Sequence, residues 1–454
     1  MSNPNMTRDL SADLVKLYRA NAHVLADNTG EILNMQRQDA LEDFMRLGVP
    51  DIKNEDYKYT RIEDYLKGNY DVEFTNDPFK VNLREIFKCD IPELDTHVVL
   101  VMNGFYYHDN NLSDLPEGII VCGLNEASVR YPEIFRQHYG RYARTANDGL
   151  IALNTLFAHD GVFVYVPEGQ RLDRPLQVIN LSFSFRNLRI TRRNLIITGD
   201  NATCNIILCD HTLSAHSYVT NSLTEVYAGK NARFDFSRMQ NENSISSQIT
   251  HTFIHQEENS VVSSNTISLH GGLIRNNFYS RLNGTGCENN VYGLFLGDDN
   301  QHIANYTLIN HATPNSTSNQ LFKGILDDNA TGAFNGKIYV SRNAQKTIAY
   351  QKNNNLLLSP TARMNSKPHL EIYADDVKCS HGATIGRLDN EAMFYLRSRG
   401  ISEKEARQLL MYAFADEIIG KIQVSLLRDR IIDMVDKRLR GELACCSNCD
   451  LRFG

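Results

Sequence analysis

Two residues near the end of a long repetitive region have the types and the spacing that metal or nucleophilic chemistry requires. Cys379 and His381 stand two apart within Ala374–Gly386. Residues two apart in an extended chain project to the same face, so a thiolate and an imidazole would lie side by side. Such a pair can ligate iron, copper or zinc, or act as a nucleophile beside its base. A buried structural pair is the plainer alternative, and the two residues alone leave all three open.

Two other groups have metal-binding residue types but weaker patterns. His251 and His255 are four apart, which would suit zinc on a helix, but the residues around them alternate as a strand does. A metal role is therefore not favoured there. Near the end of the sequence, Cys445, Cys446 and Cys449 include one C-x-x-C spacing. A single such pair is weak support for zinc or a cluster, and we expect exposed thiols at a terminus instead.

The search for catalytic motifs yields little. The chain has no G-x-x-x-x-G-K-[ST] loop, no G-x-S-x-G elbow and no H-E-x-x-H motif, so it is not expected to hydrolyse ATP by itself. Paired carboxylates at Asp298-Asp299 and Asp327-Asp328 could cleave sugars on a β-helix. These pairs occupy recurring turn positions, however, where backbone geometry already explains an aspartate. The motifs alone therefore give no strong support for an enzyme.

Composition excludes several classes of protein. The net charge of −7 argues against a nucleic-acid binder, since no overall cationic field would attract phosphates. No apolar run reaches membrane-spanning length, and the polar start predicts an untargeted, soluble protein. The nine cysteines are odd in number and scattered, which favours reduced thiols in the cytoplasm over a disulfide framework.

The middle of the chain alternates apolar and polar residues with a period of two, which predicts strands. Several turns between these strands share an Asn-Ala ending, at Gly199–Ala202, Gly229–Ala232, Asp327–Ala330 and Ser341–Ala344. Asparagine tolerates the left-handed backbone that such corners need. The first two turns lie 30 residues apart, as do those at Gly297 and Asp327, and a fixed period of this size indicates a solenoid. A β-sandwich remains the alternative, since the repeat is imperfect.

Helical patterns flank this region. In the N-terminal part, a helical run from Ile32 to Leu47 should stop at Gly48–Pro50. The polar segment Glu55–Thr60 that follows is interpreted as a solvated loop with two tyrosines packed on the neighbouring helix. Near the C-terminus, Asp389 can cap a first helix that ends before Gly400.

A capping box of Ser402 and Glu405 should open the next helix, which continues to Ile431 with a bend near Gly420. We expect the apolar face of this helix to run through Ala406, Leu409, Leu410, Ala413 and Phe414 and to continue through Ile422, Leu426 and Ile431. This face meets either the protein's own β-domain or a partner.

The predicted fold is mainly β, with a central right-handed parallel β-helix between helical regions. The expected divisions are a helical region at 1–90, a mixed α/β segment at 91–148, the β-helix at 149–386, a helical domain at 387–441 and a cysteine-bearing tail at 442–454.

The residues around Cys379 and His381 resemble the signature of the SufB/SufD family of iron–sulfur cluster assembly proteins. The similar stretches include Val377–Gly386, Phe394–Ile401, Glu405–Leu410 and Lys367–Ile372, together with Asn335-Gly336-Lys337 and Gln351-Lys352. The N-terminal helical start, followed by Leu47–Pro50 and Glu55–Thr60, is similar to the SufD branch of the family. Tyr57 stands where the family usually has tryptophan, and we expect its packing role to survive.

This resemblance implies a non-enzymatic assembly subunit that pairs with a SufB-like protein through the β-helix. The C-terminal helices would hold a SufC-like ATPase, and a transient iron–sulfur cluster would form at the interface with the SufB-like subunit. Cys379 and His381 would lie at that interface, with His381 the likelier iron ligand, and no tightly bound cofactor is expected in the isolated chain. A SufB-like scaffold acting as a homodimer, or a carbohydrate-active β-helix enzyme, are the alternatives.

Overall fold

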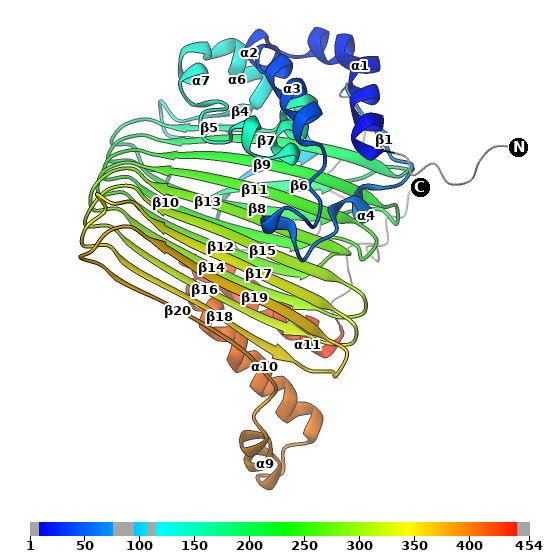
Figure 1. The fold of residues 1–454 in the computed structure, drawn as a ribbon, viewed down its shortest axis with the longest axis vertical. Coiled ribbons are helices and arrows are strands. Elements are labelled where there is room, and N and C mark those ends of the chain that lie inside the picture. The colour runs from blue at the N-terminus through cyan, green and yellow to red at the C-terminus, as the bar shows by residue number, and fades with distance from the viewer. Residues whose placement is uncertain (1–8, 76–94, 108–111, 113, 443–454) are drawn as a thin grey trace, which may run out of the picture.

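A computed structural model describes residues 9–75, 95–107, 112 and 114–442 of the chain. Its centre is a parallel β-solenoid of about seven turns, in which successive long strands alternate between two sheets (Figure 1). Each sheet therefore pairs every second strand of the sequence in parallel. The predicted parallel β-helix is confirmed, and the β-sandwich alternative is wrong.

In the residues that the structure describes, the two sheets, A and B, each contain ten strands. Sheet A runs in the order β19 (Arg363–Ile372), β17 (Thr331–Val340), β15 (His302–His311), β13 (Leu273–Leu282), β11 (Ser247–Gln256), β9 (Tyr218–Ala228), β7 (Leu188–Thr198), β5 (Val162–Val166) and β4 (Ile120–Gly123), with β1 (Asp71–Val72) beside β7. Sheet B runs in the order β20 (Lys378–Gly386), β18 (Ile348–Leu357), β16 (Thr317–Leu326), β14 (Glu288–Gly297), β12 (Val261–His270), β10 (Arg233–Asn241), β8 (Thr203–Thr212), β6 (Leu176–Ser182), β2 (His97–Met102) and β3 (Phe105–Tyr106).

The corners of the solenoid follow the expected turn chemistry only in part. Asn201 and Asn231 have the left-handed backbone that the Asn-Ala endings predicted, with φ of 58° and 55°. In the turn at 327–330 it is Asp328, with φ of 47°, that takes this conformation. No residue of Ser341–Ala344 does, so the prediction is wrong for that turn. Aspartate, like asparagine, can form hydrogen bonds with its local backbone and so tolerates the left-handed region. The left-handed residue can therefore lie one position earlier in the turn at 327–330 than in the turns with Asn201 and Asn231.

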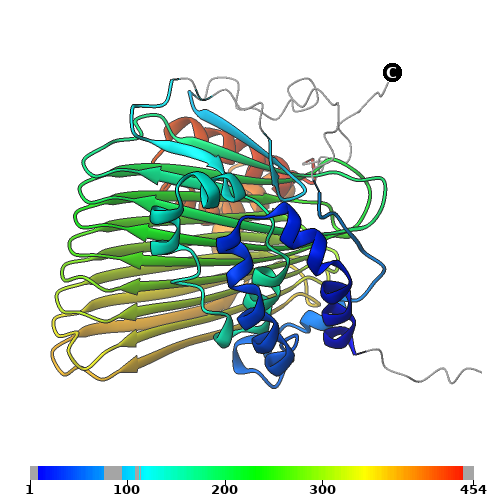
Figure 2. The same ribbon diagram turned by 90° about the horizontal axis from the view of Figure 1, so that it is seen from above.

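Helices of the N-terminal half cover the outer face of sheet A at one end of the solenoid, as Figures 1 and 2 show. They are α1 (Leu10–Asn28), α2 (Glu31–Met35), α3 (Arg37–Leu47), η1 (Glu55–Tyr57), α4 (Ile62–Leu66), α6 (Leu124–Arg130), α7 (Pro132–His138), η2 (Thr145–Asn147) and α8 (Gly149–Phe157). The run expected from Ile32 to Leu47 is divided between α2 and α3, and Gly149–Phe157, which the sequence assigned to the β-helix, is a helix. All nine residues of α8 are buried, so they show no polar face that could reveal the helical period.

The segment Glu55–Thr60 is not the solvated loop that its polarity suggested. Tyr57 is 1% exposed and donates a hydrogen bond to Asp148 Oδ2 at 2.5 Å. The guanidinium of Arg275, on β13, lies 3.9 Å from the centre of the Tyr57 ring, and its Nη2 donates to the carbonyl of Asp56. These contacts fasten the segment to sheet A and keep a buried aromatic at position 57.

Three C-terminal helices follow the solenoid: α9 (Asn390–Ser398), α10 (Glu403–Ile419) and α11 (Ser425–Arg440). Asp389 caps α9, and Ser402 with Glu405 forms the predicted capping box of α10. The single bent helix expected to Ile431 is wrong, because α10 ends at Gly420 and α11 begins afresh at Ser425.

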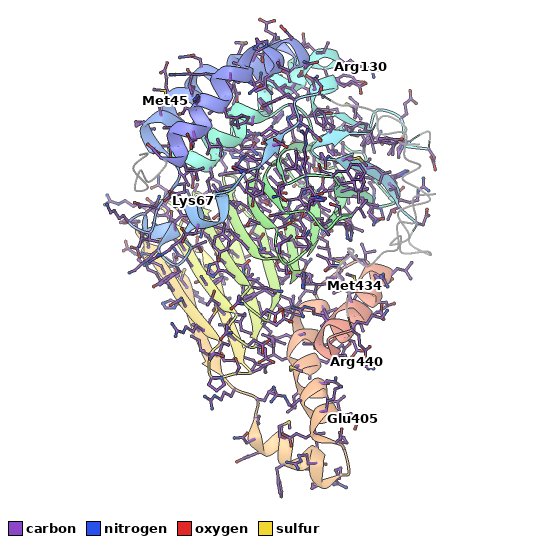
Figure 3. The ribbon with its side chains drawn as sticks, turned by 90° about the vertical axis from the view of Figure 1, so that its right-hand side faces the viewer. Met45, Lys67, Arg130, Glu405, Met434 and Arg440 are labelled. Atoms are coloured by element: carbon purple, nitrogen blue, oxygen red, sulfur yellow. The ribbon has the colours of Figure 1, made fainter. Side chains whose placement is uncertain are left out.

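The helices α10 and α11 bury an apolar face on the outer side of sheet B (Figure 3), whereas α9 projects beyond the last strands (Figure 1). The buried residues of α10 are Ala406, Met411, Ala415, Ile418 and Ile419. Of the face that the sequence predicted, Ala406, Ile422 and Ile431 are buried, whereas Leu409 is 49% exposed. Within the described part of the chain, no helix is both long and apolar enough to cross a membrane.

Candidate functional site

The solenoid ends in an open coil formed by β19 and β20. Each is the terminal strand of its sheet in the described structure, so each presents backbone N–H and C=O groups on one side without a strand partner. Pro368 lies within β19, and proline is tolerated in a sheet at such an edge because it has no ladder hydrogen bond to lose there. Figure 1 shows these two strands at the rim opposite the N-terminal helices.

Cys379 and His381 both lie on β20, in this last coil, as the sequence predicted for two residues of one extended strand. The parallel register pairs Cys379 with Ala349 and His381 with Gln351 on β18. Ala349 and Gln351 are 0% and 1% exposed, which identifies their side as the inner face of the solenoid. Both candidate residues therefore line the inner face at its open mouth.

The two side chains differ in accessibility and in chemistry. Cys379 is half-buried and packs in an apolar cluster with Ala349, Ala374 and Val377. This burial raises the pKa of the Cys379 thiol, so the thiol form is favoured at neutral pH until a metal or a base removes the proton. His381 is exposed to solvent at the mouth. Its imidazole is therefore the more available donor of the pair.

Hydrogen bonds at both ends hold β20 in place. The N–H of Asp376 donates to Gln345 Oε1 at 2.9 Å, immediately before the strand begins. Farther along, Thr384 Oγ1 donates to Asn354 Oδ1 at 3.1 Å, and Asn355 Nδ2 donates to the carbonyl of Thr384 at 3.3 Å. The strand that carries the two candidate ligands is thus held on β18 along one edge, and along its other edge it has no strand partner in the described structure.

Gly382 and Gly386 lie on β20, on the face of sheet B opposite to Cys379 and His381. A Cβ atom added at either glycine would have no atom within 4 Å, so the fold of this chain does not require glycine there. Glycine inside a strand commonly marks the close approach of another backbone or a ligand. Large apolar residues are also exposed around this coil: Ile348, Tyr350, Ile372, Tyr373 and Ile385.

Gln351 is the residue of this site whose place the sequence pattern did not reveal. The segment Gln351–Asn355 is polar at every position, so alternation could not show which residues face inward. In the structure Gln351, Asn353 and Asn355 are buried inside the solenoid. Only the register of β18 against β20 reveals that Gln351 adjoins His381.

The remaining sequence candidates do not join this site. His251 and His255 both lie on β11, and residues four apart on a strand are separated by roughly 13 Å, too far to share one metal ion. His251 is fully buried, which lowers its pKa to about 4, and His255 Nε2 contacts Glu257 Oε1 at 2.9 Å. Among the described residues, no group of three or more histidine, cysteine, aspartate or glutamate side chains could hold a metal ion.

The paired aspartates are accounted for by structure. Asp298 forms a bidentate ion pair with Arg438 of α11, with Oδ1 2.6 Å from Nη2. Asp299 and Asp328 occupy left-handed corners of the solenoid. Cys445, Cys446 and Cys449 lie outside the described residues.

A groove of about 730 Å³ lies between α10 and α11 on the side away from sheet B. Its apolar walls include Leu409 and Tyr412 of α10 and Ile432 of α11. Four carboxylates line it as well, from Glu405, Asp429, Asp433 and Asp436, against the single cation Arg440. Figure 3 labels Glu405 and Arg440 near one another in this helical domain. Apolar walls with an acidic border suit a protein segment that is both apolar and basic.

Comparison with known proteins gives consistent matches along the chain. A family model described as "SUF system FeS cluster assembly, SufBD core domain" matches residues 184–414, and one described as "SufBD protein N-terminal region" matches residues 8–178. The chain is 28% identical to the iron–sulfur cluster assembly protein SufD of Escherichia coli, over 92% of this chain and 96% of that protein. It is 30% identical to an iron–sulfur cluster assembly SufBD family protein of Synechocystis, over 90% of this chain and 91% of that protein.

Proposed function

Because the chain belongs to the SufBD family of iron–sulfur cluster assembly proteins, we propose that it is a SufD-like, non-catalytic subunit of a cluster assembly complex. In this role it pairs with a SufB-like subunit through β19 and β20, and with a SufC-like ATPase through α9–α11. The nascent cluster is cargo that is built at the SufB-like interface and then transferred.

The observation that carries this proposal is the open last coil with two donors at its mouth. Cys379 and His381 are too few to complete a tetrahedral iron or cluster site, and the described residues supply no third ligand. The strand edges beside them are unpaired and therefore suit pairing with another chain. A partner that adds strands here would bring its own ligands to the same place.

The chemistry of the two donors suits transient binding. Cluster iron accepts histidine in place of cysteine, and neutral imidazole adds no negative charge and binds less firmly than thiolate. An assembly protein must release what it builds, so a releasable imidazole at the accessible position is useful. Cys379, whose thiol pKa is raised by burial, supplies a thiolate only when a metal displaces its proton.

The ligand role is tested by His381→Ala in the complex reconstituted with SufB-like and SufC-like proteins under anaerobic conditions. We expect normal folding and complex formation but a loss of iron and sulfide incorporation. The matched control is His369→Ala, since His369 is exposed on β19 but alternates to the outer face of sheet A. Iron incorporation that His381→Ala leaves unchanged contradicts the ligand role.

The ATPase role is tested at the groove between α10 and α11. Removing all residues after Gly386 would abolish SufC binding on this proposal, but it would also expose the apolar face of sheet B that α10 and α11 cover. Leu409→Asp is sharper, because Leu409 is half exposed and its replacement leaves that face covered. We expect at least a tenfold loss of affinity for the ATPase; unchanged affinity rejects this groove as the docking surface.

A SufB-like scaffold that acts as a homodimer makes a different prediction for the isolated chain. Such a scaffold would accept sulfide without a second subunit. Measuring sulfide acceptance by the chain alone, and by the chain with its SufB-like partner, separates the two functions.

A further inference from the structure

The inner face of sheet B carries a column of hydrogen-bonding side chains that ends at His381. The register pairs Gln320 on β16 with Gln351 on β18, and Gln351 with His381 on β20. Neighbouring strands lie about 4.8 Å apart, so three side chains at matching positions on one face are in contact range in turn. The column runs from the closed interior of the solenoid to its open mouth.

Gln351 stands out in this column because its amide has no partner. Its side chain is 1% exposed, yet neither Oε1 nor Nε2 makes a hydrogen bond to any described residue. Burying such a group without a partner costs on the order of 1–3 kcal/mol, so a native protein rarely leaves one unused. Room for the amide is provided by Gly336 on β17, where an added Cβ would lie 2.5 Å from Gln351 Nε2.

The two neighbours of Gln351 offer complementary groups. Gln320 Oε1 accepts a hydrogen bond from Thr307 Oγ1 at 2.7 Å, and a carbonyl oxygen can accept a second one. On the other side, His381 is exposed and no described side chain holds its ring. A rotation of the Gln351 side chain would satisfy its amide on both sides, with Nε2 donating to Gln320 and Oε1 accepting from an imidazole N–H.

We propose that Gln351 is the positioning residue of His381, an inference that rests on the ligand role proposed above. Gln351 Oε1 accepts a hydrogen bond from the N–H of His381 Nδ1, the ring nitrogen nearer the strand. This hydrogen bond selects the tautomer whose Nε2 carries the free lone pair and directs that lone pair into the mouth. Histidine ligands commonly donate their second N–H in this manner, which fixes the ring and raises the basicity of the ligating nitrogen.

The test is the tautomer of His381 in the full-length chain without metal, read by NMR after labelling the histidines with ¹⁵N. His381→Ala assigns the signal. In the unsubstituted chain we expect mainly the Nδ1–H form of the neutral ring. In Gln351→Leu we expect a reversal to mainly the Nε2–H form, which imidazole prefers when nothing holds it. An unchanged ratio in a folded Gln351→Leu protein overturns the inference.

A second variant covers the case in which leucine disturbs the packing. Gln351→Glu keeps an oxygen acceptor at the same place, so the Nδ1–H form should persist. Loss of the Nδ1–H form in Gln351→Glu also overturns the inference.

A second readout separates this inference from the proposed function. In the reconstituted complex, Gln351→Leu should lower iron incorporation by roughly 10-fold or more, and Gln351→Glu should retain it. If His381→Ala leaves iron incorporation intact, the ligand role fails, while the tautomer still reports whether Gln351 contacts the ring. If His381→Ala abolishes incorporation but Gln351→Leu changes neither readout, only the positioning role fails.

Discussion

At the scale of single residues, the interior of the solenoid holds charges as well as apolar side chains. Asp210 on β8 receives Arg192 Nη1 at 3.1 Å and Arg238 Nε at 3.0 Å. Glu242 lies in the same cluster, 2% exposed, with its Oε1 3.9 Å from Arg192 Nη1. No described residue forms a hydrogen bond with either of its carboxyl oxygens. The two arginines are thus directed at Asp210, and Glu242 is left desolvated beside them.

This arrangement predicts a pH dependence of stability. Burial, aided by the charge of Asp210 and opposed by Arg192 and Arg238, raises the pKa of Glu242 from 4.5 to about 7. Below pH 4.5 both folded and unfolded states bind the proton, and between pH 4.5 and 7 only the folded state does. The free energy of unfolding therefore falls as pH rises through this window, by up to about 3 kcal/mol from this group.

Glu242→Gln removes that loss, because the amide resembles the protonated acid. We expect the free energy of unfolding of Glu242→Gln, minus that of the unsubstituted chain, to increase from pH 4.5 to 7 and then level off. Denaturant unfolding at a series of pH values measures it. Glu258→Gln, at an exposed turn, is the control and should show a flat difference. A flat difference for Glu242→Gln as well would mean that the buried carboxyl ionises normally.

At the scale of elements, local signals predicted well where one rule decides the outcome. The caps at Asp389 and Ser402 follow from capping chemistry alone. Where tertiary packing decides, the sequence was insufficient. The face of α10 that meets sheet B includes Met411, Ala415 and Ile418, but an apolar stripe through Leu409 was equally consistent with the pattern.

The last turn of α11 shows how a helix is held to the solenoid. Arg438 Nε donates to the carbonyl of Leu269 at 2.8 Å, and both terminal nitrogens of Arg438 bind the carboxylate of Asp298. Burial opposes ionisation of Asp298, yet its hydrogen bonds with Arg438 and the charge of Arg438 hold its pKa below the ordinary value. One side chain therefore joins α11 to two turns of the solenoid.

Arg438→Met should loosen this end of α11. The variant keeps the apolar stem but leaves Asp298 and the carbonyl of Leu269 without their partner, at a cost of about 2 kcal/mol. We expect faster hydrogen exchange in Met434–Arg440 and a matching loss in the free energy of unfolding.

Arg440→Met is the matched control for Arg438→Met, since Arg440 forms a surface ion pair with Asp436 that is worth at most about 0.5 kcal/mol. Equal effects of the two substitutions would show that Arg438 is no special anchor.

At the scale of the whole molecule, the two ends of the solenoid differ. At the first end, β3 pairs with β2 and β4 pairs with β5 in antiparallel fashion, so the parallel ladder is closed by strands of opposite direction. Helices of the N-terminal half also cover this end (Figure 1). At the other end, β19 and β20 have no such closure in the described structure. Proteins rarely leave two adjacent edges bare unless something pairs with them.

The sequence located the two candidate ligands, because Cys379-x-His381 needs only one strand to align them. It also placed them at the end of the solenoid, because the helical pattern begins at Asp389, a few residues after the pair. It could not identify Gln351 as their neighbour, because parallel register depends on contacts about 30 residues apart along the chain.

The open end therefore makes a prediction about assembly that does not depend on iron. Ile385 on β20 is 48% exposed at this end, and Ile385→Asp places a charge where a partner's strand would have to approach. We expect its affinity for the SufB-like subunit to fall at least tenfold, measured by analytical ultracentrifugation, while its free energy of unfolding changes by less than about 1 kcal/mol.

The control for this surface is Ile245→Asp, because Ile245 is 59% exposed in the turn between β10 and β11, several coils from the open end. A charge there should leave the affinity unchanged, since no edge strand lies beside it. If both substitutions weaken association equally, the partner does not distinguish the open end from the side of the solenoid. If neither does, pairing through β20 is wrong, and the donors at its mouth face solvent in the assembled complex.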